Sequence, residues 1–199
     1  IQIRNRATIG GNMANATPSA DMAPSLLVLS ARAMIVGSNG DQTVDLEKFF
    51  RGPGQTVMES GDILTEIRIP PAAPGLVGEY IKFSPREMMD LAYVGVATSL
   101  VLKDRRCAEV RIALGAVSPT PMRARKAEAV LKNQVLTEEL AERAGEEAAG
   151  ECKPISDVRS SAAYRREMVR VNTKRSLLNV AFGPSGPIPW TQRRDKRYH

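Results

Sequence analysis

The chain has 199 residues, of which 43% are hydrophobic and 25% charged. It can therefore bury a sizeable core, and its composition is not that of a disordered chain. The net charge of +6 raises nucleic-acid binding as a possibility. However, the basic residues are concentrated only at 165–175 and 193–197, without the interleaved aromatic residues that base stacking requires. A solvated helix face and a basic tail explain the charge better, so we expect no nucleic-acid partner.

The residues that are scarce exclude several kinds of site. The single histidine, His199, makes a Ser-His or Cys-His nucleophile improbable. The two cysteines, Cys107 and Cys152, lack C-x-x-C spacing and cannot alone hold an iron–sulfur cluster or a structural zinc. We expect both to be reduced core residues of a cytoplasmic protein. If the protein is an enzyme, a bound cofactor carries its chemistry.

The ends and the apolar runs also carry information. The first residue is Ile1 rather than Met, so we expect a processed, proteolysed or cloned fragment. No apolar run is long enough to cross a bilayer, and no signal peptide opens the chain. We therefore expect no membrane span.

The first 70 residues predict a mixture of turns, helix and strands. Residues 1–12 look turn-rich, and a helix follows at about 21–30, with Ser19 or Asp21 as its cap and Pro24 in its first turn. Residues 31–37 and 42–46 read as two strands around a turn. A short helical turn at 47–50 and a strand at 62–69 complete this part.

A stretch with three prolines and a glycine, residues 70–75, is the best candidate for a domain boundary. After it, residues 78–84, 93–103 and 107–117 predict three antiparallel strands, the last two joined by a hairpin turn at 104–106. The side chains expected on the inward face are Val94, Val96, Val101, Val110, Ile112 and Leu114.

The remainder predicts helices at 123–132, 137–151 and 161–182, followed by an extended tail at 183–199. Leu140, Ala144 and Ala148 form one stripe of the second helix. The third helix has an expected apolar side and an expected charged side. The apolar side holds Tyr164, Met168, Val171, Leu178 and Phe182, and the charged side holds Arg166, Arg170 and Lys174.

Two short runs near the start, T-I-G-G-N at 8–12 and A-T-P-S-A-D at 16–21, could bind a ligand. Adjacent glycines let the backbone approach a ligand, and successive N–H groups in such a turn form an anion-binding concavity. Hydroxyl and amide groups could donate hydrogen bonds, whereas the Asp21 carboxylate could accept them from ribose or ribityl hydroxyls. These residues suit a sugar-diphosphate chain. On the residues alone, however, a Gly-Gly turn before a capped helix is more often only a turn.

The run R-N-x-A-T-I-G-G-N, followed by A-T-P-S-A-D, resembles the second FAD-binding motif of the molybdenum hydroxylase flavoproteins. These are the FAD-binding medium subunits of enzymes of the xanthine dehydrogenase, carbon monoxide dehydrogenase and aldehyde oxidoreductase type. The similarity continues through G-D-I-L-T-E-I-R-I-P and E-Y-I-K-F-S-P-R-E, and it covers residues 1–182.

The resemblance implies a set of FAD contacts. Asp21 would contact the sugar portion, Leu64 the flavin, and Lys82 would lie near the cofactor. Without the resemblance, Leu64 would be a core residue and Lys82 an ordinary exposed strand lysine. The complete set of expected cofactor-binding residues is Thr8, Ile9, Gly10, Gly11, Asn12, Thr17, Ser19, Asp21, Leu64 and Lys82.

The resemblance also implies an α+β fold in two parts. Residues 1–72 would form the second subdomain of a FAD-binding domain of the p-cresol methylhydroxylase type, and residues 73–75 a linker. Residues 76–182 would form a domain like the C-terminal domain of the carbon monoxide dehydrogenase flavoprotein, with a three-stranded antiparallel sheet packed with helices. The glycine-rich first FAD motif of the family is not found in this sequence. We therefore expect part of the FAD cleft to lie outside this chain.

The implied function is that of an oxidoreductase component. It would pass electrons from [2Fe–2S] clusters on a small subunit through FAD to NAD or another acceptor, while a molybdopterin-binding large subunit oxidises the substrate. The alternative is a non-catalytic scaffold that docks these two subunits and binds no FAD itself.

Overall fold

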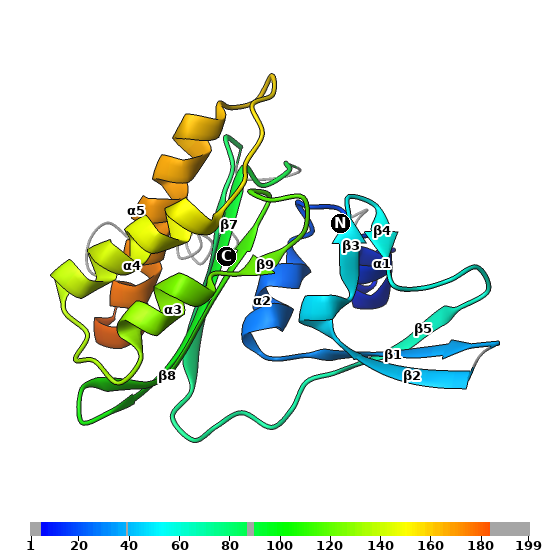
Figure 1. Cartoon of the computed structure of the whole chain (residues 1–199), viewed down its shortest axis with the longest axis horizontal. Coiled ribbons are helices and arrows are strands. Elements are labelled where there is room, and N and C mark those ends of the chain that lie inside the picture. The colour runs from blue at the N-terminus through cyan, green and yellow to red at the C-terminus, as the bar shows by residue number, and fades with distance from the viewer. Residues whose placement is uncertain (1–4, 39, 87–89, 184–199) are drawn as a thin grey trace, which may run out of the picture.

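The computed structural model describes residues 5–38, 40–86 and 90–183, so nearly all of the predicted 183–199 tail lies outside the described residues. The first part of the chain forms two short helices beside a three-stranded antiparallel sheet of order β2-β1-β5, with a two-stranded sheet β3-β4 (Figure 1). Its elements are α1 (Ile9–Ala14), α2 (Met22–Val28), β1 (Arg32–Gly37), β2 (Gly40–Asp45), the 3-10 helix η1 (Leu46–Lys48), β3 (Phe50–Gly52), β4 (Gln55–Thr56) and β5 (Ile63–Arg68).

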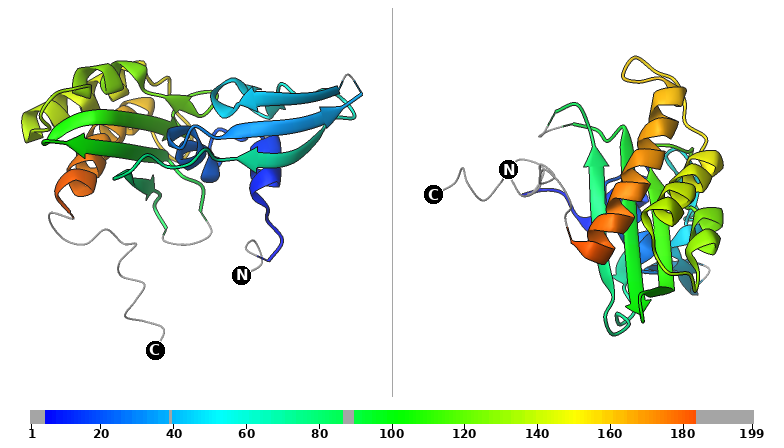
Figure 2. Two further views of the ribbon diagram at one scale, coloured as in Figure 1. Left: turned by 90° about the horizontal axis from the view of Figure 1, so that it is seen from below. Right: turned by 90° about the vertical axis from the view of Figure 1, so that its left-hand side faces the viewer.

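The second part is a four-stranded antiparallel sheet of order β6-β7-β8-β9 with three helices. Its elements are β6 (Val77–Phe83), β7 (Val94–Lys103), β8 (Arg106–Gly115), β9 (Met122–Arg123), α3 (Arg125–Leu131), α4 (Glu138–Glu151) and α5 (Ala162–Phe182). The helices α3, α4 and α5 cover one face of this sheet, and α2 packs on the other (Figure 2). The α+β class and the three predicted strands are confirmed, and the two-residue β9 adds a fourth strand.

Strand β7 is buried on both faces because it lies between these two layers. Alternate residues, including Val96 and Leu100, pack towards α3–α5, whereas Ala97 belongs to the core around α2. The prediction placed Val101 with Val96, but Leu100 takes that side. Leu102 continues the same alternation on the helical side, and the register shift between Val101 and Leu102 lies opposite an extra residue of β8, Ala108. The bulge breaks the two-residue alternation of β8 instead, since Cys107 and Val110 both face the helical core.

The helices α4 and α5 approach each other closely through small residues. Thr137 caps α4, its hydroxyl accepting a hydrogen bond from the backbone N–H of Leu140. The buried face of α4 contains Ala144, Gly145 and Ala148, which confirms most of the predicted stripe. A Cβ atom added at Gly145 would lie 2.5 Å from the carbonyl oxygen of Arg170. The two helix backbones therefore leave no room for a side chain at this point.

The predicted apolar side of α5 was wrong by about one residue. Tyr164 and Phe182 are about half exposed, at 47% and 57%. The buried side chains are instead Arg165, Val169, Asn172, Thr173, Ser176 and Leu177. Most of these are polar, and some have partners on other elements: the Ser176 and Thr98 hydroxyls lie 2.6 Å apart. A polar buried face cannot be recognised from apolar periodicity alone.

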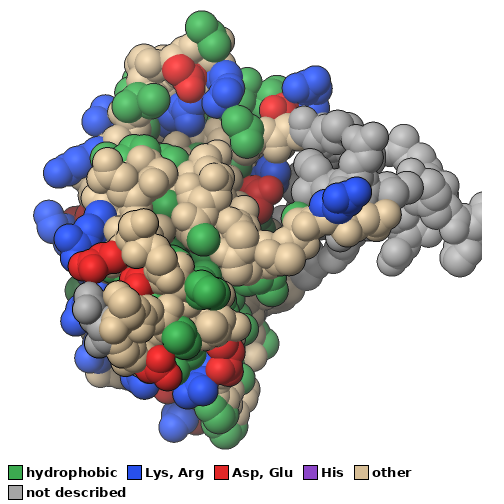
Figure 3. All heavy atoms as spheres, turned by 90° about the vertical axis from the view of Figure 1, so that its right-hand side faces the viewer, with side chains coloured by type: hydrophobic (Ala, Val, Ile, Leu, Met, Phe, Trp, Pro, Cys, Tyr) green, Lys and Arg blue, Asp and Glu red, His purple; other side chains and the backbone are tan. Residues whose placement is uncertain are grey.

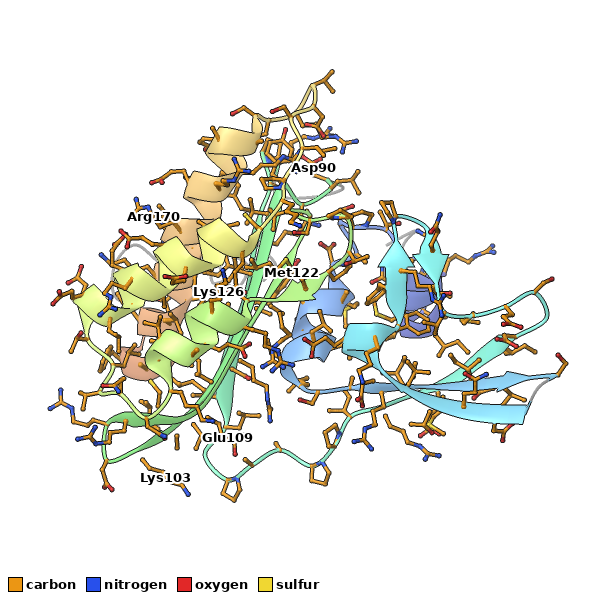
Figure 4. All side chains as sticks on the ribbon, viewed as in Figure 1. Asp90, Lys103, Glu109, Met122, Lys126 and Arg170 are labelled. Atoms are coloured by element: carbon orange, nitrogen blue, oxygen red, sulfur yellow. The ribbon has the colours of Figure 1, made fainter. Side chains whose placement is uncertain are left out.

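The predicted charged side of α5 partly faces α4 rather than solvent. Lys174 Nζ lies 2.8 Å from a Glu138 carboxylate oxygen and 3.0 Å from one of Glu142. Arg170 pairs with Glu142 and with Glu167, and it is labelled in Figure 4. Ion pairs therefore line the seam between the two helices.

Cys107 and Cys152 are both buried and free, which confirms that they form no disulfide. Burial raises the pKa of both thiols, and for Cys152 the nearby Arg166 charge opposes this effect. Among the described residues, no helix combines the length and the apolar character that crossing a membrane would require.

Two hydrophobic cores hold the molecule together. One lies between the four-stranded sheet and α3–α5, and the other surrounds α1, α2 and the first sheet. The second core also contains Ala97 of β7 and Ala113 of β8. Residues 69–76, with their three prolines, form no helix or strand between the two parts. The linker at 73–75 and the domain limits stay predictions, because the packing across the two parts is continuous.

Candidate functional site

The Gly10-Gly11 pair lies in the first turn of α1, so the prediction of a turn was wrong. Thr8 is the N-cap residue, and its hydroxyl accepts a hydrogen bond from the backbone N–H of Gly11 at 2.9 Å. Neither glycine has a positive φ. The capping hydroxyl starts a helix here because it satisfies one of the N–H groups that have no partner within the helix.

The two glycines differ in the space around them. A Cβ atom at Gly11 would lie 3.0 Å from Thr8 Oγ1, which is a tight contact. A Cβ atom at Gly10 would lie 3.9 Å from Leu64 Cδ2, an ordinary van der Waals distance. Glycine within a helix costs about 0.5–1 kcal/mol relative to alanine. The packing of the described residues therefore gives no reason for glycine at position 10. The contact also places Leu64, on β5, beside Gly10.

Asn12, rather than Ser19 or Asp21, supplies the hydrogen bond at the start of α2. Its side-chain oxygen Oδ1 accepts from the backbone N–H of Met22 at 3.3 Å. Asp21 occupies the N-cap position but makes no side-chain capping bond. The predicted capping role of these two residues was wrong because a side chain ten positions earlier takes it. This bond joins the two runs of the predicted site.

Asp21 instead faces β6 of the second part. Lys82 Nζ lies 2.7 Å from Asp21 Oδ2, and the Tyr80 hydroxyl donates to Asp21 Oδ1 at 3.3 Å. The Lys82 side chain is 20% exposed and that of Asp21 46%. Burial, together with the charge and hydrogen bond of Asp21, raises the pKa of Tyr80, which therefore remains a donor. Sequence reasoning missed Tyr80, although its position two residues before Lys82 puts it on the same strand face.

The remaining predicted residues lie around this set. Ile9 is 48% exposed on α1. Thr17 and Ser19 are partly buried in the loop between α1 and α2. The Thr17 hydroxyl accepts from Asn15 Nδ2 at 2.5 Å, and a backbone bond from Ala20 to Thr17 folds the loop. No hydrogen bond or ion pair in the described structure links Thr17 or Ser19 to Lys82 or Leu64.

The geometry therefore forms one continuous strip. Leu64 lies beside Gly10, α1 is bonded to α2 through Asn12, and Asp21 reaches Lys82. This strip offers an apolar side chain, a helix backbone open to close approach, a carboxylate and an ammonium group. It can bind a ligand that has an apolar ring and a polar, hydroxylated chain. Within the described ranges, no group of three or more His, Cys, Asp or Glu residues is arranged to hold a metal.

A cleft of about 790 Å³ opens near the other end of α2, beside Leu27, Ser30 and Ala31. Five arginines line it, but each is ion-paired with a carboxylate, and none of the predicted site residues belongs to it. We therefore do not assign the cofactor to this cleft. The arginines are Arg32, Arg68, Arg111, Arg123 and Arg125.

Two family models match this chain. The family model of the CO dehydrogenase flavoprotein C-terminal domain matches residues 79–180. The model of the FAD binding domain in molybdopterin dehydrogenase matches residues 1–72. Together they cover most of the chain, and the strip lies where the two matched regions meet.

Individual relatives match almost the whole chain. The xanthine dehydrogenase FAD-binding subunit of Escherichia coli is 31% identical over 94% of this chain. The glyceraldehyde dehydrogenase medium chain of Sulfolobus acidocaldarius is 33% identical over 91%. The structure of carbon monoxide dehydrogenase from Hydrogenophaga pseudoflava superposes with a TM-score of 0.88 at 34% identity, covering 93% of this chain. The chain spans 64% of the length of each of these three. The chain therefore belongs to the family of FAD-binding medium subunits of the xanthine and carbon monoxide dehydrogenase type.

Proposed function

We propose that this chain binds FAD along the strip from Leu64 to Lys82, as part of a molybdopterin-dependent dehydrogenase. When bound, FAD supplies the redox chemistry that links [2Fe–2S] clusters on a small partner subunit to NAD or another acceptor. A large partner subunit would carry the molybdopterin. The two free, buried cysteines support a cytoplasmic location.

The observation that carries the proposal is the glycine at position 10. It lies within a helix, it has room for a methyl group, and it adjoins Leu64. Glycine at position 10 makes the helix less stable than alanine would, and its presence is explained if a ligand approaches the backbone there. The family match to an FAD binding domain over residues 1–72 supports FAD as that ligand.

The side chains of the strip have separate roles in this proposal. Leu64 packs against the apolar ring system, and the α1 backbone at Gly10 and Gly11 lies along the diphosphate. Asp21 accepts hydrogen bonds from sugar hydroxyls, and Lys82 provides positive charge beside it. The other polar or flanking contacts would come from Thr8, Ile9, Asn12, Thr17 and Ser19.

Gly10→Ala tests the proposal sharply, because the protein itself accommodates the methyl group at 3.9 Å from Leu64. We expect the folded protein to keep or gain stability, by about 0.5–1 kcal/mol, and to lose FAD. The measurement is the flavin-to-protein ratio of the native assembly, together with its thermal unfolding. Gly11→Val would be less informative, since it would also collide with the Thr8 cap.

The matched control is Gly150→Ala in α4, where an added Cβ has nothing within 4 Å. It makes the same exchange in another helix and should leave the flavin content unchanged. Equal flavin content in Gly10→Ala and Gly150→Ala would remove α1 from the cofactor site.

One observation favours the scaffold alternative, in which the chain docks the partner subunits without FAD. Both oxygens of Asp21 are already engaged, one by Tyr80 and one by Lys82. A carboxylate with satisfied oxygens gains less from sugar hydroxyls. The absorbance spectrum of the purified native assembly separates the two proposals, because only FAD binding predicts a flavin spectrum that depends on Gly10.

A further inference from the structure

Arg165 of α5 is a buried cation whose two terminal nitrogens are both hydrogen-bonded, while its Nε has no partner among the described residues. Its side chain is 4% exposed, and Nη2 donates to both carboxylate oxygens of Asp157 at 2.9 and 3.0 Å. Nη1 donates to the carbonyl oxygens of Tyr93 at 3.0 Å and Ala116 at 3.2 Å. The guanidinium carbon also lies 5.6 Å from the centre of the Tyr93 ring. A planar fork is needed to make all these contacts at once.

The first arm of this network leads towards Asp21. The backbone N–H of Ala116 donates to the carbonyl of Pro18 at 2.7 Å, three residues before Asp21. Ala116 has φ of 64°, a left-handed conformation that is unfavourable for alanine and persists only when its surroundings hold it. Arg165 bonds its carbonyl on one side, and Pro18 accepts its N–H on the other. The position of the 16–21 loop is therefore tied to that of Arg165 through the two peptide groups of Ala116.

Close packing reinforces the first arm. A Cβ atom at Gly115, the last residue of β8, would lie 2.8 Å from Pro24 Cγ. The end of β8 thus lies directly against the start of α2, which leaves little freedom in the approach of the two segments.

The second arm leads towards Lys82. The backbone N–H of Tyr93 donates to the carbonyl of Phe83 at 2.8 Å, and Phe83 directly follows Lys82. The Phe83 and Tyr93 rings pack edge to face with their centres 6.5 Å apart. Arg165 therefore bonds directly to the two residues that hold the segments carrying Asp21 and Lys82.

We infer that Arg165, oriented by Asp157, is a positioning residue that sets the separation of Asp21 and Lys82 and so shapes the FAD site. The inference rests on the proposed function, because it assigns these two side chains to the cofactor. Asp157 holds the fork with two oxygens and leaves Nη1 free for the two carbonyls. Neither residue touches the strip itself, and both act through backbone groups.

Two conservative variants test the role in the native assembly. Asp157→Asn keeps the shape but removes the charge that orients the fork, and Arg165→Lys keeps the charge but cannot bond Asp157, Tyr93 and Ala116 together. We expect FAD to bind about 10- to 100-fold more weakly in both, as a misplaced binding group predicts. We also expect altered visible circular dichroism of the flavin that remains bound. Asp157→Glu, which restores the charge, should recover most of the affinity.

Hydrogen exchange gives a readout that does not depend on flavin. In Asp157→Asn, peptides covering 16–21 and 81–84 should exchange faster. The matched control is Ser176→Ala, which removes a buried hydrogen bond to Thr98 from the same helix face but touches neither segment. Ser176→Ala should leave the exchange rates of both peptides and the flavin spectrum unchanged, even if it lowers the melting temperature as much as Asp157→Asn does.

The outcomes distinguish a failure of the positioning role of Arg165 from a failure of the proposed FAD site. If Asp157→Asn and Ser176→Ala lower stability alike and leave exchange at 16–21 and 81–84 unchanged, Arg165 has only a structural role and the inference is wrong. If Asp21→Asn and Lys82→Met both leave FAD affinity unchanged, the assignment of these side chains to the cofactor fails. The exchange data would in that case still show whether Arg165 positions the two segments.

Discussion

The two parts of the molecule bury their cores in different ways. Residues 76–182 close a core between their own sheet and their own helices α3–α5. The core of residues 5–72 instead includes Ala97 and Ala113, which belong to β7 and β8 of the other part. We therefore expect the stability of the first part to depend on the second more than that of the second depends on the first. The proposed cofactor strip lies across this unequal junction.

The largest expected effect is the loss of stability when a core side chain is truncated in either part. Phe49 is fully buried in the first core and Leu114 in the second. Phe49→Ala should cost about 3–5 kcal/mol and Leu114→Ala about 2–5 kcal/mol. Phe49→Ala should increase hydrogen exchange only within residues 5–72, because the second core closes without it. Leu114→Ala should increase exchange in both parts.

The same exchange experiment can contradict this dependence. Protection of residues 22–36 that survives in Leu114→Ala would show that the first part is stable by itself. Loss of protection in α4 and α5 on Phe49→Ala would show that the dependence is mutual.

The second prediction concerns the independence of the helical core. Gly145→Ala should destabilise the protein by about 1–3 kcal/mol, since the added methyl group would lie 2.5 Å from a backbone oxygen of α5. Gly150→Ala in the same helix should instead stabilise by about 0.5–1 kcal/mol. Denaturant unfolding measures both. Similar effects at the two positions would mean that the α4–α5 contact is looser than the structure shows.

The third prediction concerns the ion pair that crosses the junction. Because Asp21 is 46% exposed, its pairing with Lys82 should contribute only about 0–1 kcal/mol to stability. Asp21→Asn should therefore leave unfolding nearly unchanged. It should weaken FAD binding by about 1.5–3 kcal/mol if the carboxylate accepts sugar hydrogen bonds. Flavin titration of the native assembly gives the affinity, and an unchanged value would leave Asp21 with only its contact to β6.

The smallest expected effect is a change in pH dependence within the second part. Burial alone would raise the pKa of Asp157, but the N–H groups of Arg159 and Ser160 and the Arg165 guanidinium outweigh it and lower the pKa. A lowered folded-state pKa means that the stabilisation is complete above the unfolded value of about 3.9 and is lost as the pH falls through the folded value. Asp157→Asn should therefore flatten the acid limb of the stability curve below about pH 4. An acid limb as steep as that of the parent protein would contradict this role.

The strands were predicted well because their alternation is a local property of the sequence. The pairing of β1 with β2, the strand β5 and the β7–β8 hairpin all follow from short runs with turns between them. The caps were predicted less well. Sequence proximity favoured Asp21 as the cap of α2, but Asn12 approaches from another helix. A hydrogen bond between residues ten positions apart has no periodic signature.

The membership of the candidate site stays a prediction, and its geometry could not be predicted from the sequence. The resemblance named Gly10, Leu64 and Lys82, and the structure places Leu64 beside Gly10 and Lys82 beside Asp21. The resemblance could not predict the hydrogen bond from Tyr80 to Asp21 or the hydrogen bonds of Arg165 to Tyr93 and Ala116. These contacts depend on how segments that are distant in the sequence meet in the fold. Arg165 was also hidden because an arginine on a long helix is ordinarily assigned to the solvent face.

Strand β5 has a practical consequence for handling the protein. It is the last strand of the order β2-β1-β5, so within the described residues its outer edge has no neighbouring strand. Ile63 is 63% exposed on it, and Ile69 just beyond it is 50% exposed. Hydrophobic side chains also show between charged ones on the end of the molecule that carries this sheet (Figure 3). An open strand edge is a template for pairing with another chain, which charged neighbours such as Glu66 and Arg68 counteract. Concentrated solutions of the protein should therefore self-associate through this edge, and more readily if both charged residues are replaced by apolar ones.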